Sequence, residues 1–445
     1  MTSKGTICIT IEIFPPIVIG GAELSTHLAA KALATSGYRV VVLTPHYKGE
    51  EIEHDGQLTV IRFPYPKWIP VGDNLYFTNP LFYFYLGCQI IKAHKKYKFD
   101  FIHAHHTYSI IGSFFAAKIL RKRFFVTLRD TKCICIHGAN ECLARDKHSY
   151  VPYHEDGLPP VNCKFVDFYR CYTHSERIDE KLKKKKFLKR FFLHARKILE
   201  SIDCKLRHFS LRRSTNVISV SDALGAKYKK ALALDNISTI YNLPPVLFSE
   251  KSENPYWFKK LLEEEKQIVL YVGAISINKG CQCLIDAMFQ VQTVVPNVFF
   301  VFVGKVYDDI KSNDMVDPYC YFTGHLKPSD VQKYFINCSI VVVPSITDEA
   351  FGRSALEGAM HGKPVIVTRN GGLVEIIEDK VNGLVVESGD VVGLSNAIIS
   401  ILNSKSLRDE FKDNSEKIIA SKFSVGAILE RYNLIYSIVE DPPPN

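Results

Sequence analysis

The clearest pattern in the chain runs from Val341 to Val367 and reads VVVPSITDEAFGRSALEGAMHGKPVIV. It starts with an apolar run, turns polar around Glu349 and then takes the spacing of a helix over Arg353–His361. Gly362 and Pro364 end this helix, and a second apolar run follows. The order of strand, helix and strand is typical of parallel sheets whose strands are joined by helices.

The same alternation continues in both directions along the chain, which predicts an α/β protein with doubly wound, Rossmann-like parallel sheets covered by helices on both faces. It pauses at the Pro-Pro pair after Asn242, so we expect two domains, residues 1–241 and 242–423, with a hinge near 242–265. A last helix within residues 424–445 could cross back to the first domain. The strands expected are Ile7–Ile13, Val40–Leu43, Phe101–His103, Phe124–Thr127, Val217–Val220, Ser238–Tyr241, Ile268–Val272, Val298–Val303, Tyr319–Phe322, Ile340–Val343, Val365–Val367 and Leu384–Val386.

Length and composition fit this interpretation, because 445 residues with 23% charged residues suit two globular domains. No run of about 20 uncharged apolar residues is present, so we expect no membrane-spanning helix. The apolar stretch Thr6–Gly21 contains Glu12 and Pro15-Pro16, which favours a buried strand over a signal peptide. Twelve cysteines in so long a chain do not make a disulfide framework, and we expect a cytoplasmic protein.

Two carboxylates in the opening stretch are candidates for ligand binding. Glu349 precedes the predicted helix, and Glu357 lies one turn inside it among small and apolar residues. The helix N-terminus offers backbone N–H groups and positive potential to a phosphate, and Gly352 lets that phosphate come close. Glutamates at such positions are often only solvated surface residues. Glu357 is the exception here, because a carboxylate in apolar surroundings needs a partner.

The segment EAFGRSALE, residues 349–357, resembles the Glu-x7-Glu motif of the retaining GT-B glycosyltransferases of family 4. Other segments resemble the landmarks of this family in the expected order. They are PPIVIGGAELSTHLAAKALATSGYRVVVLT, DFIHAHHTYSIIG, VISVSDALGAKY, STIYNLPPVLF, VLYVGAISINKG, FFVFVGK, YFTGHL and NGGLVEIIEDKVNGLVV. The resemblance covers most of the chain outside residues 131–200. It implies the GT-B architecture, in which two such domains face each other across a cleft.

The resemblance also implies roles for residues of the second domain. Glu357 binds the nucleotide ribose, Glu349 lies by the hydroxyls of the donor sugar, and Lys279 neutralises the departing diphosphate. The family usually carries Arg after the glycine that ends this strand, but here Ala274 stands in that place; either Arg353 substitutes for it or the donor is held more weakly. The backbone residues assigned to sugar and diphosphate are Phe351, Gly352, Arg353 and Gly273.

In the first domain, the family's glycine loop corresponds to Gly20-Gly21, which would face the diphosphate and the acceptor. The dinucleotide pattern G-x-G-x-x-G is absent, so NAD binding is not expected. His105 matches the second histidine of the family's His-x-His and would contact the donor sugar, whereas His103 and His106 are expected to be structural. Arg129 and Asp130 follow a strand where the family often has His-Asp, and the resemblance implies that they lie on the acceptor side.

Metal binding by His103, His105 and His106 is disfavoured, because alternation along a strand would point them to different faces. A long irregular insertion follows, within residues 131–200, and it carries Cys133, Cys135, Cys142, Cys163 and Cys171. Their spacing does not match the usual zinc pairs, so we expect ordinary thiols.

The segment Lys181–Glu200 holds nine Lys or Arg against one Glu, and apolar residues recur in it at helical spacing. Either it packs on its own domain, or it lies on an anionic membrane surface, to which aromatic-rich Pro64–Tyr85 could add a second contact. Nucleic acid is not expected, since nothing else in the sequence indicates base recognition.

These patterns together predict the transfer of a hexose from a UDP- or GDP-sugar to an acceptor hydroxyl, with retained configuration and without a metal ion or cofactor. The acceptor would be a lipid-linked or cell-surface glycan precursor, which would place the protein in the cytoplasm or peripherally on the inner face of the membrane. Two other functions remain open. One is a partner subunit without turnover, and the other is a GT-B enzyme that epimerises or phosphorolyses sugars.

Overall fold

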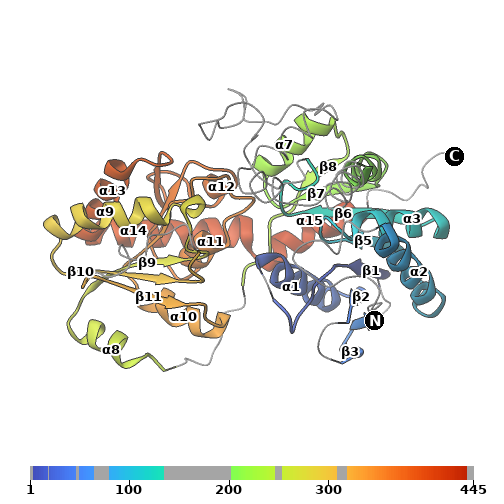
Figure 1. Ribbon diagram of the computed structural model, residues 1–445, viewed down its shortest axis with the longest axis horizontal. Helices are drawn as coiled ribbons and strands as arrows, with labels where there is room; N and C mark the ends of the chain where they lie inside the picture. Colours follow the sequence, from blue (N-terminus) through green and yellow to red (C-terminus); the bar gives the residue numbers. More distant parts are fainter. Residues whose placement is uncertain are drawn as a thin grey trace, which may run out of the picture. The chain divides into compact units, whose positions relative to one another are not determined.

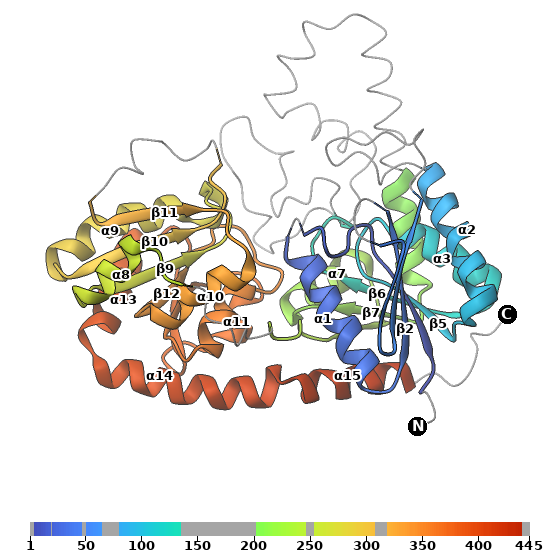
Figure 2. The same cartoon turned by 90° about the horizontal axis from the view of Figure 1, so that it is seen from below.

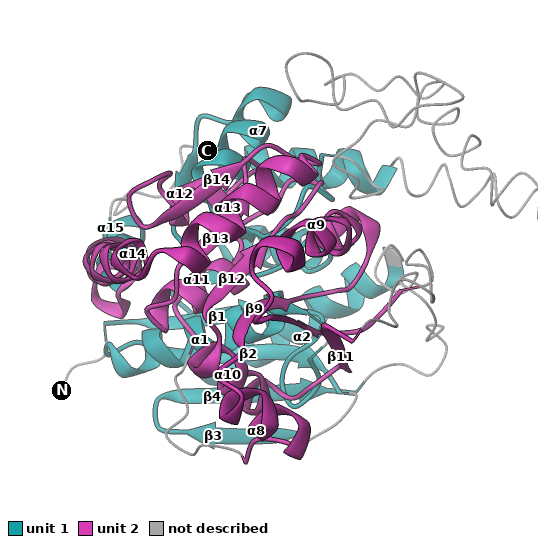
Figure 3. Ribbon diagram, turned by 90° about the vertical axis from the view of Figure 1, so that its left-hand side faces the viewer, with its two compact units in different colours: residues 1–242, 429–445 teal, residues 243–428 magenta. Residues whose placement is uncertain are grey.

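The structure of the protein is a computed structural model that describes residues 4–18, 20–46, 50–64, 80–134, 202–245, 253–307 and 318–437. The chain forms two compact units (Figures 1 and 3). Unit 1 comprises residues 1–242 and 429–445, and unit 2 comprises residues 243–428. This division follows Asn242, next to the expected boundary after residue 241.

Unit 1 is built on a sheet whose described strands have the order β3-β4-β2-β1-β5-β6-β7-β8. All neighbours pair in parallel except β3 and β4, which form an antiparallel hairpin at one edge. The strands are β1 (Thr6–Thr10), β2 (Arg39–Pro45), β3 (Ile52–Asp55), β4 (Leu58–Phe63), β5 (Phe101–Ala104), β6 (Arg123–Leu128), β7 (Asn216–Ser219) and β8 (Ile237–Thr239). The helices are α1 (Gly21–Thr35), α2 (Pro80–Tyr97), α3 (Ile110–Leu120), residues 202–212 and α7 (Asp222–Leu232).

The central strands of unit 1 are continuous apolar runs because helices cover them on both sides. Val40, Val41 and Val42 of β2 have no exposed surface, and neither do Ile7 and Ile9 of β1. Parallel strands that are buried on both faces have such uninterrupted apolar sequences. The prediction of an α/β fold is confirmed. Gly37 follows α1 with φ +104°, a left-handed conformation that favours glycine at the end of a helix.

The last described helix, α15 (Val425–Ser437), carries the chain from unit 2 back into unit 1 (Figure 2). Its end packs on the sheet of unit 1, where Tyr436 is 3% exposed. The hydroxyl of Tyr436 lies 2.8 Å from Nδ1 of His103, and Arg123 donates a 2.7 Å hydrogen bond to the carbonyl of Tyr436. Tyr38 likewise donates to the side chain of Asn433, at 3.2 Å. Residues from both ends of the chain therefore build one core.

Unit 2 contains a parallel sheet with the described strand order β11-β10-β9-β12-β13-β14. Its strands are β9 (Gln267–Val272), β10 (Val298–Val303), β11 (Cys320–Gly324), β12 (Ile340–Val343), β13 (Val365–Thr368) and β14 (Gly383–Val386). Its helical segments are α8 (Tyr256–Glu263), η1 (Ile277–Lys279), α9 (Cys281–Val294), α10 (Pro328–Asn337), α11 (Arg353–Met360), α12 (Leu373–Ile376), α13 (Val391–Asn403), α14 (Lys405–Ile418) and η3 (Ile419–Phe423).

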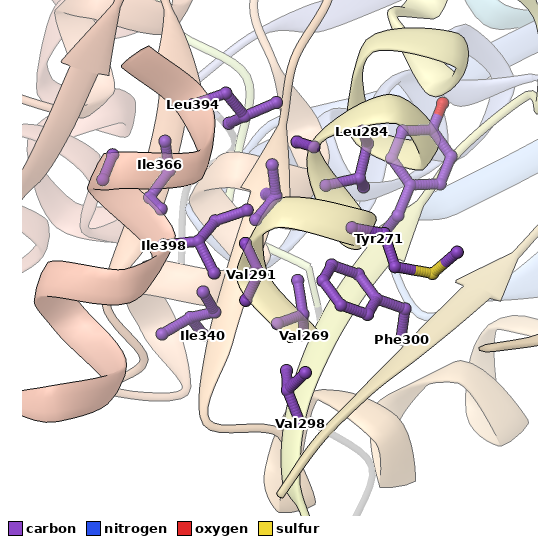
Figure 4. Close-up of a cluster of buried hydrophobic side chains, with 14 of the residues drawn as sticks. Val269, Tyr271, Leu284, Val291, Val298, Phe300, Ile340, Ile366, Leu394 and Ile398 are labelled. Carbon is purple, nitrogen blue, oxygen red and sulfur yellow. The ribbon is translucent and has the colours of Figure 1, made fainter. Parts of the chain in front are cut away.

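The core of unit 2 lies between the sheet and the helices α9 and α13. Leu284 and Val291 of α9 meet Ile398 of α13 over the strand residues Val269 and Phe300 (Figure 4). All five side chains are at most 1% exposed. This packing fixes the sheet and with it the loops that leave the carboxyl ends of its strands.

The expected hinge near residues 242–265 is wrong in its second half. Residues 256–263 form α8, and Phe258 and Leu261 of this helix are buried. The ring of Phe258 packs on Tyr334 of α10 with 4.7 Å between the centroids, so α8 belongs to the body of unit 2.

Candidate functional site

The strand order of unit 2 reverses between β9 and β12. From β9 the chain proceeds through β10 to β11 at one edge, and from β12 it proceeds through β13 to β14 at the other. In open parallel sheets the loops at the carboxyl ends diverge at such a reversal and leave a crevice in which ligands bind. The loops in question follow Val272 and Val343, and they carry Lys279 and Glu349.

These two loops are locked together through their backbones. The carbonyl of Asn278 accepts hydrogen bonds from the N–H groups of Ile346, at 3.1 Å, and Thr347, at 3.2 Å. Gly280 has φ +71°, and a Cβ atom built on it would lie 1.7 Å from the carbonyl oxygen of Pro344. Glycine is therefore required at this position, both by its conformation and by the close approach of the second loop.

Lys279 and Glu349 form an ion pair at this junction, with 2.6 Å between Nζ and Oε1. The hydroxyl of Ser345 donates a second hydrogen bond to the same oxygen, also at 2.6 Å. The side chains of Lys279 and Glu349 are 36% and 19% exposed, so both remain accessible. The structure thus brings together two residues that are 70 positions apart and that the sequence assigned to one site.

The loops after β13 and β14 support the loop that carries Glu349. Thr368 and Asn370 donate to the carbonyl of Ser345, and Asn370 also donates to that of Ile346 at 3.0 Å. A Cβ atom on Gly371 would lie 2.1 Å from the carbonyl oxygen of Glu349. The position of Glu349 is therefore fixed by neighbouring loops on both sides.

Glu357 lies in α11, one turn from the helix start, and pairs with Arg353 at 3.3 Å. Burial raises the pKa of the Glu357 carboxyl, and the cation of Arg353 opposes this shift in part. The side chain keeps 21% of its surface exposed. The expectation that this glutamate needs a partner is confirmed, and Arg353 is that partner. In this conformation the guanidinium of Arg353 pairs with Glu357.

The other residues assigned to the donor side, Phe351, Gly352 and Gly273, lie at the start of α11 and directly after β9. Phe351 is 3% exposed, and its ring packs on Phe423 with 6.1 Å between the centroids. Gly352 caps α11 with φ +102°, and a Cβ atom there would lie 2.5 Å from Leu373. Gly273 follows β9 with φ +158°. The glycines keep the backbone bare of side chains where α11 and the loop after β9 begin.

In unit 1 the strand order reverses between β1 and β5. Gly20 and Gly21 lie in the connection after β1, at the start of α1. The carboxylate of Glu23 accepts the N–H of Gly20 at 2.9 Å, which is the behaviour of a helix-start residue. His105, His106 and Ser109 follow β5 on the other side of the reversal.

His105 is fully buried, and both of its ring nitrogens lie close to nitrogen-bearing groups. Nε2 is 3.2 Å from Nδ1 of His103, and Nδ1 is 3.3 Å from a guanidinium nitrogen of Arg129. Burial and the neighbouring His103 lower the pKa of His105 well below its usual value. The expectation that alternation separates the histidines is wrong for this pair, because their ring centroids are 4.0 Å apart. The structure presents no exposed atom of His105 to a ligand.

His106 was expected to be structural, but it is the most exposed of His103, His105 and His106, with 20% of its side chain exposed. Its Nδ1 lies 3.0 Å from Oε2 of Glu12, and its Nε2 lies 3.8 Å from Asp130. Burial alone would lower the pKa of His106, but the carboxylates of Glu12 and Asp130 together outweigh it and the pKa is raised. The other oxygen of Glu12 is buried and has no hydrogen-bond partner among the described residues. The sequence signalled Glu12 only as a charge inside an apolar strand.

Asp130 and Arg129 take different positions after β6. Asp130 faces His106 and Lys132 and accepts a 3.2 Å hydrogen bond from Thr107, with its side chain 29% exposed. Arg129 turns toward His105 and donates to the side chain of Asn242. Asp130 therefore belongs with Glu12 and His106 in one polar cluster, and Arg129 belongs to the buried histidine pair.

Most of the cysteine-rich insertion and the basic segment Lys181–Glu200 lie outside the described residues, as does the greater part of Pro64–Tyr85. Cys133 is described and is fully buried, and burial raises the pKa of its thiol to about 12. Among the described residues, no group of three or more His, Cys, Asp or Glu side chains is arranged to hold a metal ion. None of the described helices has the length and hydropathy needed to cross a membrane.

Two family models match the chain. "Glycosyltransferase Family 4" matches residues 19–155, and "Glycosyl transferases group 1" matches residues 253–418. Together they account for most of both units. The chain belongs to the family 4 glycosyltransferases, and its two Rossmann-like units form the GT-B fold.

Individual relatives agree with this assignment. An uncharacterized glycosyltransferase of Methanocaldococcus jannaschii is 32% identical over 39% of this chain and 48% of its own length. The 2-deoxystreptamine N-acetyl-D-glucosaminyltransferase of Niallia circulans is 22% identical over 95% of this chain and 98% of its own. The crystal structure of Anabaena Alr3699/HepE in complex with UDP and glucose covers 98% of this chain and 100% of its own, with 19% identity and a TM-score of 0.64.

The matched length differs among these relatives. The curated relatives with the strongest matches are aligned over 48% to 62% of their own length, so the chain spans about half of several of them.

Proposed function

We propose that the protein transfers a hexose from a UDP- or GDP-linked sugar to an acceptor hydroxyl, with retention of the anomeric configuration. The observation that carries this proposal is the pairing of Lys279 with Glu349 at the strand-order reversal of unit 2, next to α11 with its Glu357. A cation, two carboxylates and a glycine-capped helix start are the groups that a nucleoside diphosphate sugar needs.

Each group has a distinct role in this proposal. The carboxylate of Glu357 accepts the ribose hydroxyls, and the carboxylate of Glu349 accepts hydroxyls of the sugar. The backbone N–H groups at the start of α11, from Gly352, bind the diphosphate. Lys279 turns from Glu349 to the diphosphate oxygens as negative charge develops on them. The Anabaena protein, whose structure contains UDP and glucose, supports a uridine donor.

The chemical step follows from these roles. The bond between the anomeric carbon and the diphosphate oxygen breaks, and a bond from that carbon to the acceptor oxygen forms on the same face. The acceptor proton passes to the leaving diphosphate. Catalysis then rests on positioning and on stabilising the charge of the leaving group, without a metal ion or cofactor. Activity that is unchanged by a chelator would support the metal-independent step, and loss of activity restored by added Mg²⁺ would contradict it.

The acceptor is proposed to be a glycan precursor. The glucosaminyltransferase among the relatives supports transfer of a sugar as the class of reaction. The polar cluster in unit 1 offers the imidazole of His106 and the carboxylate of Asp130 to acceptor hydroxyls, and the buried carboxylate of Glu12 holds that imidazole in place. A lipid-linked acceptor, with membrane contact through Lys181–Glu200, is the form suggested by the basic charge of that segment. Liposome flotation after neutralisation of the Lys183–Lys186 run tests this contact, since unchanged flotation would count against it.

The donor site is tested by calorimetry with a panel of nucleotide sugars. We expect binding of UDP- or GDP-sugars that is lost in Glu357→Ala and weakened in Lys279→Ala. A control variant is Glu264→Ala, since this glutamate is 44% exposed and pairs with Lys260 and Lys266 before the start of β9, whereas Lys279 follows the end of that strand. Absence of binding by any nucleotide sugar would refute the donor assignment.

Two other functions are separated by the product. A partner subunit without turnover is suggested by Ala274 in place of the family's Arg. Such a subunit would neither hydrolyse nor transfer the nucleotide sugar. An epimerase or phosphorylase would change the sugar or release a sugar phosphate. NMR of the product anomer and of the leaving group distinguishes all three.

A further inference from the structure

Three helices of unit 1 pack against one another: α2, α3 and the helix of residues 202–212. Helices α2 and α3 approach closely at glycines, because a Cβ atom on Gly112 would lie 2.6 Å from the carbonyl oxygen of Tyr83. The ring of Phe114 in α3 contacts that of Phe209, with 5.7 Å between the centroids. Tyr83 in α2 donates to Asp203. The three helices are therefore mutual neighbours, and we call their outer side the three-helix face.

Each helix exposes a stripe of large apolar side chains on this face. In α2, Leu81 is 53% exposed and Phe84 is 74% exposed. In α3, Phe115 and Ile119 are 47% and 67% exposed. In the third helix the exposed apolar residues are Ile202 and Phe209. Their spacing of three, four or seven residues keeps each set on one side of its helix.

The polar residues within these stripes are basic. Lys92 and Lys95 continue the stripe of α2 after Cys88, Lys118 lies in that of α3, and Lys205 and Arg212 lie in the third. The only acidic residue in residues 80–97, 110–120 and 202–212 is Asp203. Its carboxylate is buried against Arg207, so the stripes carry no exposed negative charge.

This composition selects among possible occupants of the face. The segment Lys181–Glu200 precedes the third helix, but its own nine basic residues would repel the lysines of the stripes. A second copy of the chain would bring the same positive charges to an isologous contact. An anionic surface that also accepts apolar side chains satisfies both parts of the pattern, and that is the interface of an anionic phospholipid bilayer.

We propose that the three-helix face docks unit 1 on an anionic phospholipid surface. Phe84, Phe115, Ile119 and Phe209 enter the boundary between headgroups and acyl chains, and the lysines contact lipid phosphates. This role is independent of the proposed glycosyl transfer. It also differs from the contact suggested for Lys181–Glu200, because it requires apolar insertion by residues of α2 and α3.

The test uses the full-length protein and sedimentation with two kinds of vesicle, phosphatidylcholine alone and phosphatidylcholine with phosphatidylglycerol. We expect binding to the anionic vesicles only. The double variant Phe84→Ser/Ile119→Ser should weaken this binding about ten-fold or more, because it removes exposed apolar surface that the bilayer would bury. Neutralising Lys92, Lys118 and Lys205 to Gln should weaken it on the order of a hundred-fold, at roughly five-fold per cation.

Matched control variants remove the same number of apolar side chains or positive charges from unit 2. Phe289→Ser/Val392→Ser changes two residues of unit 2 that are 55% and 56% exposed, and it should leave vesicle binding unchanged. Replacing Lys405, Lys412 and Lys417 of α14 by Gln lowers the net charge equally, and it too should have little effect. Calorimetry with nucleotide sugars, run on every variant, separates loss of docking from loss of the donor site.

Insertion is measured directly with Phe84→Trp and, as its control, Phe289→Trp, both in a Trp68→Phe background in which Trp257 of unit 2 contributes equally. We expect the emission of the first to shift to shorter wavelength with anionic vesicles and to be quenched by lipids brominated on their acyl chains, and that of the second to remain unchanged.

Three results would overturn the proposal. The first is vesicle binding that survives Phe84→Ser/Ile119→Ser and disappears when Lys183–Lys186 are neutralised. The second is binding to duplex nucleic acid but not to vesicles. The third is a concentration-dependent dimer that Phe84→Ser/Ile119→Ser dissolves while vesicle binding is absent.

Discussion

Gly280 is the position where a single methyl group should separate the two loops of the candidate donor site. In Gly280→Ala the new Cβ atom would lie 1.7 Å from the carbonyl oxygen of Pro344, whereas real Cβ atoms stay beyond 3.0 Å. The loop after β12 would therefore have to retreat by about 1.3 Å (3.0 − 1.7). The left-handed backbone costs alanine about 1 kcal/mol, and forcing the loop apart adds about 2 kcal/mol.

The glycines at 324 and 389 provide matched controls. They have φ values of +73° and +78°, close to the +71° of Gly280, but a Cβ atom on either would have no neighbour within 4 Å. Gly324→Ala and Gly389→Ala should therefore cost only the conformational part, about 1 kcal/mol. The difference of about 2 kcal/mol isolates the close approach of the two loops.

The assay is urea unfolding followed by tryptophan fluorescence in a Trp68→Phe background, which leaves Trp257 of unit 2 as the reporter. Calorimetry with the nucleotide sugar accompanies it. We expect Gly280→Ala alone to lose affinity, by about ten-fold if the displacement breaks one charge-assisted contact. Equal stability of Gly280→Ala and the two control variants would refute the interlocking of these loops.

Three further predictions concern groups that are buried in one of the two units. Tyr436→Phe removes a hydrogen bond to His103 and should lower the stability of unit 1 by about 1 kcal/mol, measured by thermal unfolding, with exposed Tyr256→Phe as the unaffected control. Glu357 has a raised pKa in the folded protein, so its ionisation destabilises the fold as the pH rises through that pKa. In thermal unfolding, Glu357→Gln should therefore be as stable as the parent in acid and more stable than the parent at neutral pH. A parent that is the more stable of the two at neutral pH would contradict this. Burial, with Arg129 nearby, lowers the pKa of His103 to about 3, so stability present above the usual histidine pKa should be lost as the pH falls toward 3; NMR should find no protonation of His103 at pH 5.

Most strands of the sheet interiors could be predicted almost residue by residue, but the buried strand β4, Leu58–Phe63, was missed. Val298–Val303 and Ile340–Val343 have the predicted bounds, because strands buried on both faces leave uninterrupted apolar runs. The edge strand β3, residues Ile52–Asp55, was missed since all its residues are exposed and its pairing with β4 alone defines it. Tertiary pairing of this kind leaves no periodic trace in the sequence.

The candidate site divides in a similar way. The placement of Glu357 on a helix start was predictable, because capping glycine and helical spacing are local signals. The contact of Glu12 with His106 was not, since it joins residues 94 positions apart across neighbouring strands, and the preference for His105 followed the family motif rather than exposure. Local patterns predict the helix or strand on which a residue lies. The order of the strands in the sheet decides which of these residues come into contact.

The path of α15 has a consequence for the order of folding. Unit 2 is continuous in sequence, whereas the core of unit 1 includes residues from beyond residue 429. During synthesis, all of unit 2 leaves the ribosome before Tyr436 can reach His103. Unit 2 can therefore complete its sheet before the core of unit 1 is complete. A chain that stops at Asn242 would hold Arg123 and His103 without the contacts that Tyr436 provides.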